Sequence, residues 1–248
     1  MKLQQYLDYL VVWLQQQVKS NQVKGLILGI SGGVDSAVCA ALIKKAFPDL
    51  KQHLVLFMPC YSQPNDEKLV NELVTQLNLN YQIINLDNSY DNLIKSFQWD
   101  NNFQTKNKIA LANCKSRLRM TTLYAFAKAY NFLVIGTSNQ AEWYTGYFTK
   151  FGDGASDLAP LIHLNKQQVK EAAKLLKIPN SIILQLPSAG FWKGQTDEQD
   201  MGVSYNEIDK YLSNDNSNID KKIIKKIEQM HNNTKHKRNP LIMPNKFN

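Results

Sequence analysis

The residues with the clearest chemical potential form one stretch, Gly29-Ile30-Ser31-Gly32-Gly33-Val34-Asp35-Ser36. Its paired glycines let backbone N–H groups approach a pyrophosphate, because no Cβ atom stands between them and the phosphate oxygens. The Ser31 and Ser36 hydroxyls can donate to the same oxygens, and Asp35 offers a hard oxygen ligand for Mg²⁺. No Lys-Ser or Lys-Thr pair follows the glycines, so this is not a Walker A loop. The stretch predicts a pyrophosphate-binding turn.

The elements around this turn must hold it at the edge of a sheet. Gly25–Ile30 is an apolar run that predicts a buried strand, and residues 35–47 predict a helix that Pro48 stops. Further strands are predicted at 54–58, 81–86 and 132–135, and further helices at 3–14, 65–77, 108–130, 166–176, 205–212 and 218–231. Strands that alternate with helix-length segments pair in parallel through right-handed crossovers. We therefore expect an α/β fold, a doubly wound parallel sheet with additional C-terminal helices and loops, and a ligand site outside the carboxyl ends of the strands.

Composition narrows the class of protein. The 248 residues are 44% hydrophobic and 20% charged, which is typical of a globular chain, and we expect a single domain over residues 1–248. The apolar runs are too short to span a membrane and the N-terminus lacks a signal-peptide pattern, so we expect a cytoplasmic protein with no membrane partner. Cys39, Cys60 and Cys114 are widely spaced, which favours reduced thiols over a zinc site. The net charge of +8 is compatible with nucleic acid, a phosphate-rich small ligand or an ordinary basic surface.

The stretch from Ser31 to Ser36 resembles the SGGxDS pyrophosphate loop of the ATP-pyrophosphatase superfamily. Members of that superfamily cleave ATP between its α- and β-phosphates and adenylate an oxygen of a second substrate. Their Rossmann-like sheet, of the adenine nucleotide alpha-hydrolase type, agrees with the order of elements above. This resemblance alone leaves open amide ligases, GMP synthetase, argininosuccinate synthetase and tRNA-modifying thiolases or lysidine synthetases.

Later segments, in the same order along the chain, resemble NAD synthetases. Residues 113–120 resemble N-x-K-A-R-x-R-M, residues 136–142 G-T-x-N-x-x-E, and residues 146–154 G-Y-x-T-x-x-G-D-G. Residues 187–198 are similar to the substrate loop of that family and residues 236–238 to its basic tail. The resemblance implies ATP-dependent amidation of nicotinic acid adenine dinucleotide (deamido-NAD) to NAD by ammonia, the last step of NAD biosynthesis. An adenylated carboxylate would be the intermediate, and AMP and pyrophosphate would be released.

The same resemblance implies roles for individual residues. Mg²⁺ would be bound by Asp35 and Glu142. Besides the stretch from Gly29 to Ser36, ATP would be bound by Thr137, Lys166 and Ser188. The residues implied for deamido-NAD are Arg117, Lys150, Asp157, His236 and Lys237. Asp35 and Lys166 would act in catalysis, and Asp153 is a candidate for the base that deprotonates ammonium.

Two competing functions remain to be weighed. A tRNA-modifying enzyme of the lysidine synthetase kind would suit the positive charge, but the chain leaves no room for a separate RNA-binding domain. A non-catalytic nucleotide-binding module is disfavoured because both candidate metal carboxylates, Asp35 and Glu142, are present. Each of these segments taken singly is typical of a solvated surface: Arg117, Glu142 and residues 235–238. Only their occurrence together, in the same order along the chain, favours the NAD synthetase family.

The resemblance also predicts how the protein assembles and obtains its nitrogen. It implies a homodimer with no nucleic-acid partner. The pyrophosphate turn begins near residue 29, which leaves no room for a preceding glutaminase domain, so free ammonia is the expected nitrogen donor. The loops at 150–157 and 188–200 are rich in glycine and polar residues, and we expect them to become ordered when ligands bind.

Overall fold

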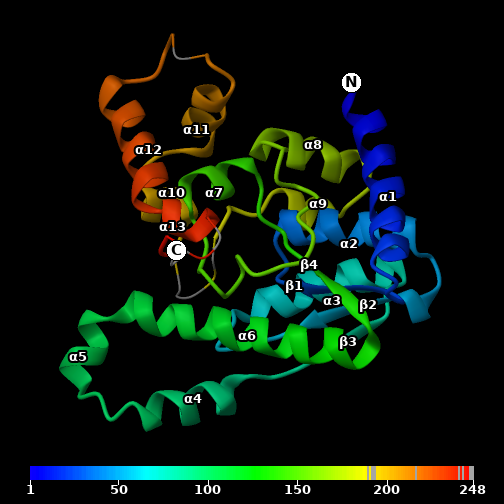
Figure 1. The fold of residues 1–248 in the computed structure, drawn as a ribbon, viewed down its shortest axis with the longest axis horizontal. Helices are drawn as coiled ribbons and strands as arrows, with labels where there is room; N and C mark the ends of the chain where they lie inside the picture. Colours follow the sequence, from blue (N-terminus) through cyan, green and yellow to red (C-terminus); the bar gives the residue numbers. More distant parts are fainter. Residues whose placement is uncertain (189, 191–193, 216, 240, 242, 246–248) are drawn as a thin grey trace.

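A computed structural model of the chain describes residues 1–188, 190, 194–215, 217–239, 241 and 243–245 (Figure 1). Residues 189 and 191–193 of the loop predicted to become ordered with ligands lie outside this description. The strands are β1 (Gly25–Ile30), β2 (His53–Phe57), β3 (Tyr81–Ile83) and β4 (Phe132–Ile135). The helices are α1 (Leu3–Ser20), α2 (Val34–Ala46), a 3-10 turn η1 (Leu50–Gln52), α3 (Pro64–Leu77), α4 (Asp87–Ser96), α5 (Asn101–Lys106), α6 (Lys108–Tyr130), α7 (Gln140–Thr145), α8 (Lys166–Leu175), α9 (Asn180–Ile183), α10 (Asp197–Met201), α11 (Tyr205–Leu212), α12 (Lys221–Asn233) and α13 (Lys235–Arg238).

The four strands form one parallel sheet in the order β3-β2-β1-β4. Strand β1 lies between β2 and β4, so the chain winds outward from β1 in one direction and then returns to its other side. This is the doubly wound arrangement, and the predicted α/β fold class is confirmed. The ends of β1 and β4 are adjacent, with Leu28 opposite Ile135, and a crevice outside this point is where such sheets bind ligands.

Alternation along the strands divides the apolar side chains between two cores. Leu26, Leu28 and Ile30 of β1 face a core that includes α1, α2, α3 and α8. Ile27 faces the opposite core, which α6 covers with residues such as Ala127. Successive side chains on a strand point to opposite faces, so a strand that is apolar throughout must be buried on both. Figure 1 shows α1, α2 and α8 on one side of the sheet and α6 on the other.

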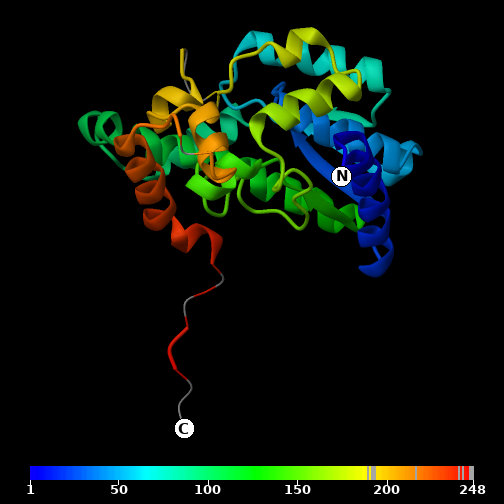
Figure 2. The ribbon, with the colours of Figure 1, turned by 90° about the horizontal axis from the view of Figure 1, so that it is seen from above.

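The C-terminal helices pack on a third, smaller core beside the sheet. Ala141 of α7, Met201 of α10, Ile208 of α11 and Ile227 of α12 are buried together. The predicted additional C-terminal helices are therefore present. Beyond α13, the described residues 241 and 243–245 lie away from the body of the molecule (Figure 2).

The segment after β3 differs from its prediction. The strand expected over 81–86 ends at Ile83, and helices α4 and α5 follow where no helix was predicted. With the first half of α6, these helices form an arm that projects beyond the sheet (Figure 1). The rings of Phe97, Trp99 and Phe103 pack together, with centroids 5.0 and 4.9 Å apart, and they tie α4 to α5. The pattern of this segment is too polar for a core helix, so only tertiary contacts reveal it.

The described residues include no membrane-spanning helix and no disulfide. In that part of the chain, no helix is both long and apolar enough to cross a membrane. Cys39 and Cys60 are buried, Cys114 is half-buried, and all three are free thiols.

The first residue of β2 is a buried histidine, His53. His53 is fully buried, its Nδ1 lies 3.1 Å from the Asp49 carbonyl oxygen, and its Nε2 accepts the Asn80 N–H at 3.2 Å. An accepting Nε2 has no proton, so the ring is neutral with its proton on Nδ1. Burial, with Lys44 nearby, lowers the pKa of His53 below its ordinary value. The fold therefore holds this imidazole in its uncharged form.

We expect the free energy of unfolding to fall as the pH drops below about 6.5, the ordinary pKa of histidine. The unfolded chain then binds a proton that the folded chain excludes from His53, so the folded state loses stability toward low pH. Urea unfolding between about pH 5 and pH 7 measures the slope, which for one proton reaches at most about 1.4 kcal/mol per pH unit. His53→Gln should remove this contribution, whereas the exposed His163→Gln should keep it. An unchanged slope in His53→Gln would contradict the assignment.

Candidate active site

The turn between β1 and α2 is organised for an anion. Gly32 has φ +84°, a left-handed conformation that favours glycine, and its Cα faces the backbone of Asp66. Ser36 Oγ donates to the Gly33 carbonyl oxygen at 3.0 Å and lies 3.2 Å from Ser31 Oγ, so the two hydroxyls brace the turn. Within the described part of the chain, no side chain caps the N-terminus of α2, which begins at Val34. The first N–H groups of this helix are therefore available to a ligand, and the helix dipole favours a negative one.

Beside this turn, two carboxylates converge on one ammonium group. Lys166 Nζ lies 2.6 Å from Asp35 Oδ2 and 3.4 Å from Glu142 Oε1. The three side chains are 6%, 17% and 16% exposed, in the order Lys166, Asp35, Glu142. Asn139 orients both acids, because its side-chain amide donates to Asp35 Oδ1 and its backbone N–H donates to Glu142 Oε2. The residues come from the first turns of α2, α7 and α8, so three helix N-termini meet here.

Two further residues extend this network. The Tyr205 hydroxyl lies 3.0 Å from Glu142 Oε1 and 2.9 Å from Asp197 Oδ2, and Lys166 Nζ lies 4.7 Å from the centre of the Tyr205 ring. Burial raises the pKa of Glu142 although the Lys166 ammonium opposes this. Burial alone would lower the pKa of Lys166, but its carboxylate neighbours hold it above the ordinary value. The Lys166 side chain therefore stays protonated and positively charged.

The same pair of carboxylates could hold a divalent metal ion. Their oxygens already surround one cationic group, and carboxylate oxygens are the ligands that Mg²⁺ prefers. Among the described residues, no group of three or more His, Cys, Asp or Glu side chains could hold a metal. The chain thus offers two ligands, and the remaining positions would belong to phosphate oxygens and water, as is usual for Mg²⁺. The donor set fits the ion that the sequence implied.

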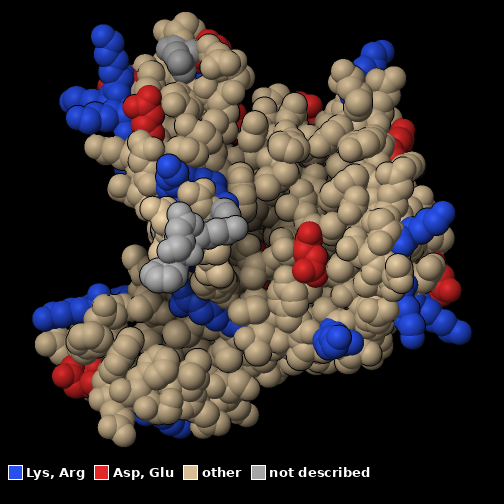
Figure 3. Space-filling view, viewed as in Figure 1, with Lys and Arg blue, Asp and Glu red and all other residues tan. Residues whose placement is uncertain are grey.

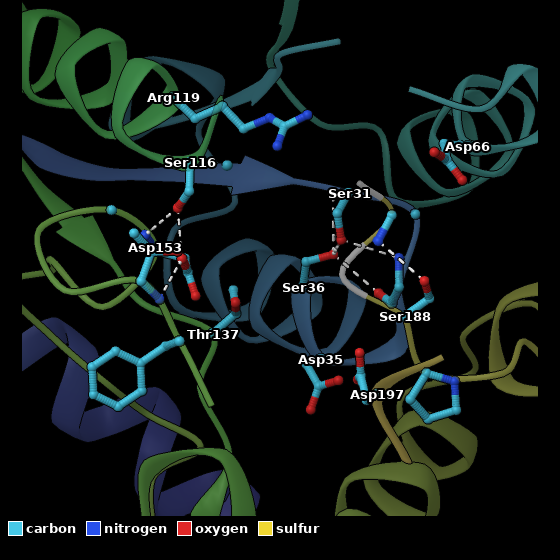
Figure 4. Close-up of a pocket in the computed structure, with 18 of the residues that line it drawn as sticks. Ser31, Asp35, Ser36, Asp66, Ser116, Arg119, Thr137, Asp153, Ser188 and Asp197 are labelled. Atoms are coloured by element: carbon cyan, nitrogen blue, oxygen red, sulfur yellow. Dashed lines mark hydrogen bonds between the residues drawn. The ribbon is translucent and has the colours of Figure 1, made fainter. Parts of the chain in front are cut away.

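Asp35, Lys166, Asp197 and the turn between β1 and α2 line one cavity of about 1240 Å³ at the carboxyl ends of the strands (Figures 3 and 4). Figure 3 shows the molecule hollowed between the arm and the C-terminal helices, with lysine and arginine side chains along the hollow. Every residue predicted to bind ATP lines this cavity: Gly29, Ile30, Ser31, Gly32, Gly33, Val34, Asp35, Ser36, Thr137, Lys166 and Ser188. Glu142 lies behind Lys166 and is not part of the wall.

Across the cavity from the pyrophosphate turn lies a second acid, Asp153 (Figure 4). Ser116 Oγ donates to Asp153 Oδ1 at 2.6 Å, and the Thr149 N–H donates to the same oxygen at 3.0 Å. The Asp153 N–H in turn donates to Ser116 Oγ at 2.8 Å. Ser116 belongs to α6, so this helix fixes the carboxylate on the far wall.

The residues predicted to bind the second dinucleotide are more dispersed. Arg117 donates to the Lys150 carbonyl oxygen at 3.3 Å, and Lys150 Nζ donates to the His236 carbonyl oxygen at 2.6 Å, which makes one continuous chain of contacts. Lys237 Nζ donates to the carbonyl oxygens of Gly146 and Phe148. Of the five predicted residues, Lys237 is the one that lines the cavity within the described part of the chain.

Asp157, the remaining residue of that set, contacts the sheet. Its Oδ2 accepts the backbone N–H of Val134 at 2.7 Å, and its Oδ1 accepts from the Tyr124 hydroxyl at 3.2 Å. The carboxylate thus satisfies a donor at the outer edge of β4. Any contact with a substrate would be made in addition to this structural one.

Comparison with known proteins agrees with this geometry. The family model for NAD synthase matches residues 6–241 of the chain. The chain belongs to the NAD synthase family. It is 42% identical to the NH(3)-dependent NAD(+) synthetase of Mesoplasma florum, over 100% of this chain and 99% of that protein.

Solved structures of the NAD synthase family share the whole fold. An NMN synthetase from Francisella tularensis has a TM-score of 0.92 and 39% sequence identity, covering 99% of each chain. An NH3-dependent NAD synthetase from Campylobacter jejuni has a TM-score of 0.81 and 28% identity, covering 98% of this chain and 100% of that one.

Several residues of this NAD synthase site were not assigned a role from the sequence. Tyr205 was placed in a helix without a function, and Asp197 and Asn139 were recognised only as parts of longer motifs. Arg119 donates from Nε to the Met58 carbonyl oxygen at 2.9 Å and reaches the cavity wall. Asn139 and Arg119 lie within the family motifs, so the sequence contains a signal for their role in the site. Tyr205 lies in no such motif, because its partners lie on other elements.

We expect Ser116→Ala to lower the free energy of unfolding by about 1–2 kcal/mol, because it removes both hydrogen bonds between α6 and Asp153. Urea unfolding measures the change. Thr122→Ala on the same helix is the matched control: its hydroxyl bonds only to the Leu118 carbonyl oxygen, and we expect a change within about 0.5 kcal/mol. Equal effects of the two substitutions would contradict a special role for Ser116 in holding this wall of the NAD synthase cavity.

Proposed function

We propose that this chain amidates the nicotinic acid carboxylate of deamido-NAD, using ATP and ammonia and releasing AMP and pyrophosphate. The names of relatives that match the whole chain support this reaction. The structural observation that carries it is the position of Asp35 and Glu142, which contact the same Lys166 ammonium group beside a turn whose helix N–H groups have no side-chain cap among the described residues. A pyrophosphate and its counter-ion need these two features next to each other.

The ATP end of the proposed reaction uses the turn and the carboxylates. The N–H groups from Gly32 to Ser36 would hold the β- and γ-phosphates, which leave together as pyrophosphate. Asp35 and Glu142 would hold Mg²⁺, which when bound neutralises charge on the leaving pyrophosphate. Lys166, Thr137 and Ser188 would contact ATP from the remaining walls. Lys166 suits this role because burial between carboxylates keeps it charged.

The chemistry proceeds in two displacements. A carboxylate oxygen of the substrate attacks the α-phosphorus, and the bond from that phosphorus to the bridging oxygen breaks to release pyrophosphate. The resulting acyl adenylate has a good leaving group, so ammonia attacks its carbonyl carbon and AMP departs with the electron pair of the C–O bond. Catalysis of this kind depends mainly on positioning and charge stabilisation.

Ammonia enters from water mostly as ammonium, which must lose a proton before it can attack. Asp153 is the proposed acceptor. Its Oδ1 is occupied by Ser116 and the Thr149 N–H, while its Oδ2 has no hydrogen bond within the described residues. A carboxylate with one oxygen anchored and one available is suited to orient a small donor.

The proposed site for deamido-NAD comprises Arg117, Lys150, Asp157, His236 and Lys237, of which Arg117, Lys150 and His236 are linked by hydrogen bonds. Four of these can be positively charged, and the second substrate brings its own pyrophosphate. Lys150 and Lys237 donate to carbonyl oxygens and lie over aromatic rings, and neither forms a salt bridge with a described residue. Positive charge without acidic partners favours a negatively charged ligand.

A mononucleotide is the second candidate for the acceptor. The observation that favours it is the NMN synthetase from Francisella tularensis, which has 39% identity to the chain and a TM-score of 0.92. Nicotinic acid mononucleotide carries the same carboxylate and would undergo the same two displacements. A tRNA-modifying function is not favoured, because relatives that cover the whole chain are named NAD synthetases. The single domain, free ammonia as donor and a cytoplasmic location stay predictions.

We expect the purified chain to form NAD from deamido-NAD, ATP, Mg²⁺ and ammonium, followed through a coupled dehydrogenase. Asp35→Asn should lower the rate at least about a hundredfold, because it removes one of two acidic cation ligands. Asp8→Asn, on the exposed face of α1, is the control and should match the unsubstituted chain. Full activity of Asp35→Asn would overturn the metal assignment.

The same assay distinguishes the two acceptors. Nicotinic acid mononucleotide is supplied in place of deamido-NAD, and AMP release is measured for both. A higher kcat/KM for the dinucleotide supports the main proposal, and a higher value for the mononucleotide supports the second. If neither acceptor leads to AMP release, both proposals are contradicted.

We also propose a homodimer and expect a solution mass of twice 28.4 kDa by sedimentation equilibrium. The projecting arm supports this, since Ile109 at the start of α6 is 71% exposed and Phe103 of α5 is 49% exposed. Ile109→Glu should shift the mass toward the monomer, whereas Val12→Glu on α1, which is 49% exposed, tests the other surface. A monomeric mass for the unsubstituted chain would contradict the proposal.

A further inference from the structure

Asp197 is a buried carboxylate with an unused oxygen. The residue is 5% exposed, and its Oδ2 accepts from the Tyr205 hydroxyl at 2.9 Å. Its Oδ1 is fully buried and has no hydrogen-bond partner among the described residues. Leaving such an acceptor unpaired is unfavourable for the folded state. Asp197 also lines the cavity, where Figure 4 draws it beside Asp35, so its buried oxygen lies just behind the cavity wall.

The Lys166 ammonium group occupies the position that a metal ion would need. It lies 2.6 Å from Asp35 Oδ2 and also within 3.4 Å of Glu142 Oε1. A metal ion held by the same two carboxylates would lie close to Nζ, and two cations in a buried site repel strongly. A metal ion that binds Asp35 and Glu142 must therefore displace Nζ. The displaced ammonium stays buried and needs another acceptor.

Tyr205 connects the two positions. Its hydroxyl lies between Glu142 Oε1 and Asp197 Oδ2, at 3.0 and 2.9 Å. Lys166 Nζ lies over the ring of the same tyrosine, 4.7 Å from its centre. The face of an aromatic ring attracts a cation, so Nζ can pass from one carboxylate to the other while it stays against the ring.

The start of α8 limits this motion to the side chain. The Lys166 backbone N–H donates to Asp209 Oδ2 at 3.2 Å, and Asn165 caps the helix through its side chain. A flexible four-carbon stem then carries the ammonium while the backbone stays fixed.

We propose that Asp197 receives the Lys166 ammonium when a divalent cation occupies Asp35 and Glu142. Asp197 is then a positioning residue: it keeps the positive charge at the cavity, beside the phosphates, after the metal has taken its place between the first two carboxylates. The proposal rests on the metal site proposed above. It differs from a role for Asp197 as a third ligand, since no group of three such side chains among the described residues could hold a metal.

The test is a double-mutant cycle with Mn²⁺ alone, whose binding is followed by electron paramagnetic resonance without nucleotide. Lys166→Met should tighten Mn²⁺ binding, because the competing ammonium is gone. Asp197→Asn should weaken binding roughly tenfold while Lys166 is present, because the displaced ammonium then lacks an acceptor. In the double variant the Asp197→Asn effect should fall below about twofold. Asp200→Asn, three residues further along α10 and bonded to the Tyr147 hydroxyl, removes an equal charge and controls for the general field.

Each other outcome is decisive. If Asp197→Asn weakens Mn²⁺ binding equally with and without Lys166, Asp197 acts as a ligand or through its charge alone, and the exchange is overturned. Failure of the unsubstituted chain to bind Mn²⁺ would overturn both the exchange and the metal site, whereas normal binding without coupling would overturn only the exchange. If Lys166→Met does not fold, a crystal structure of the unsubstituted chain with Mn²⁺ decides: Nζ should lie within about 3 Å of Asp197 Oδ1, and Nζ elsewhere would contradict the proposal.

Discussion

One shared ammonium group is the constraint on which the site depends. Asp35 and Glu142 are largely buried and close together, and without Lys166 their charges would repel in a medium that solvates them poorly. Breaking such a buried arrangement by removing one partner is typically costly, so each of the three side chains fixes the other two. Asn139, itself fully buried, orients both carboxylates by donating a hydrogen bond to each. The Lys166 ammonium therefore balances the negative charge of Asp35 and Glu142 at this end of the cavity.

The topology of the sheet explains why these residues meet. Asp35 follows β1 and Glu142 follows β4, which are neighbours in space although about a hundred residues separate them in sequence. The point where the strand order reverses leaves a crevice between two helix N-termini, and both acids lie in first turns, where the helix dipole favours negative charge. The C-terminal helices complete the arrangement from outside the sheet: they bring Tyr205 and Asp197 against Lys166 and Glu142.

The sequence predicted the sheet and the pyrophosphate turn because both depend on local patterns. Apolar runs bounded by glycine and proline mark buried strands, and the paired glycines mark a turn in which Gly32 has a conformation that other residues rarely adopt. Tyr205 and Asp197 could not be assigned this way, since their roles arise from contacts between α10, α11 and α7. The arm of α4 and α5 was missed for a related reason: its sequence is polar, and both helices are held by contacts with α6 that the pattern does not show. Asp157 illustrates a third limit, because a motif indicates that a carboxylate is present but not which donor it satisfies.

That contact of Asp157 has a consequence for the outer side of the sheet. Strand β4 is an edge strand, and an edge presents unpaired N–H and C=O groups that another chain can join by strand addition. Here the Asp157 carboxylate takes the Val134 N–H, and the N–H groups of Asp157 and Leu158 return to the Val134 carbonyl oxygen. A negatively charged side chain therefore stands where a further strand would dock. The Asp157 carboxylate and the Leu158 backbone, which forms a parallel bridge with Ile135, together occupy the groups that a further strand would need at this edge.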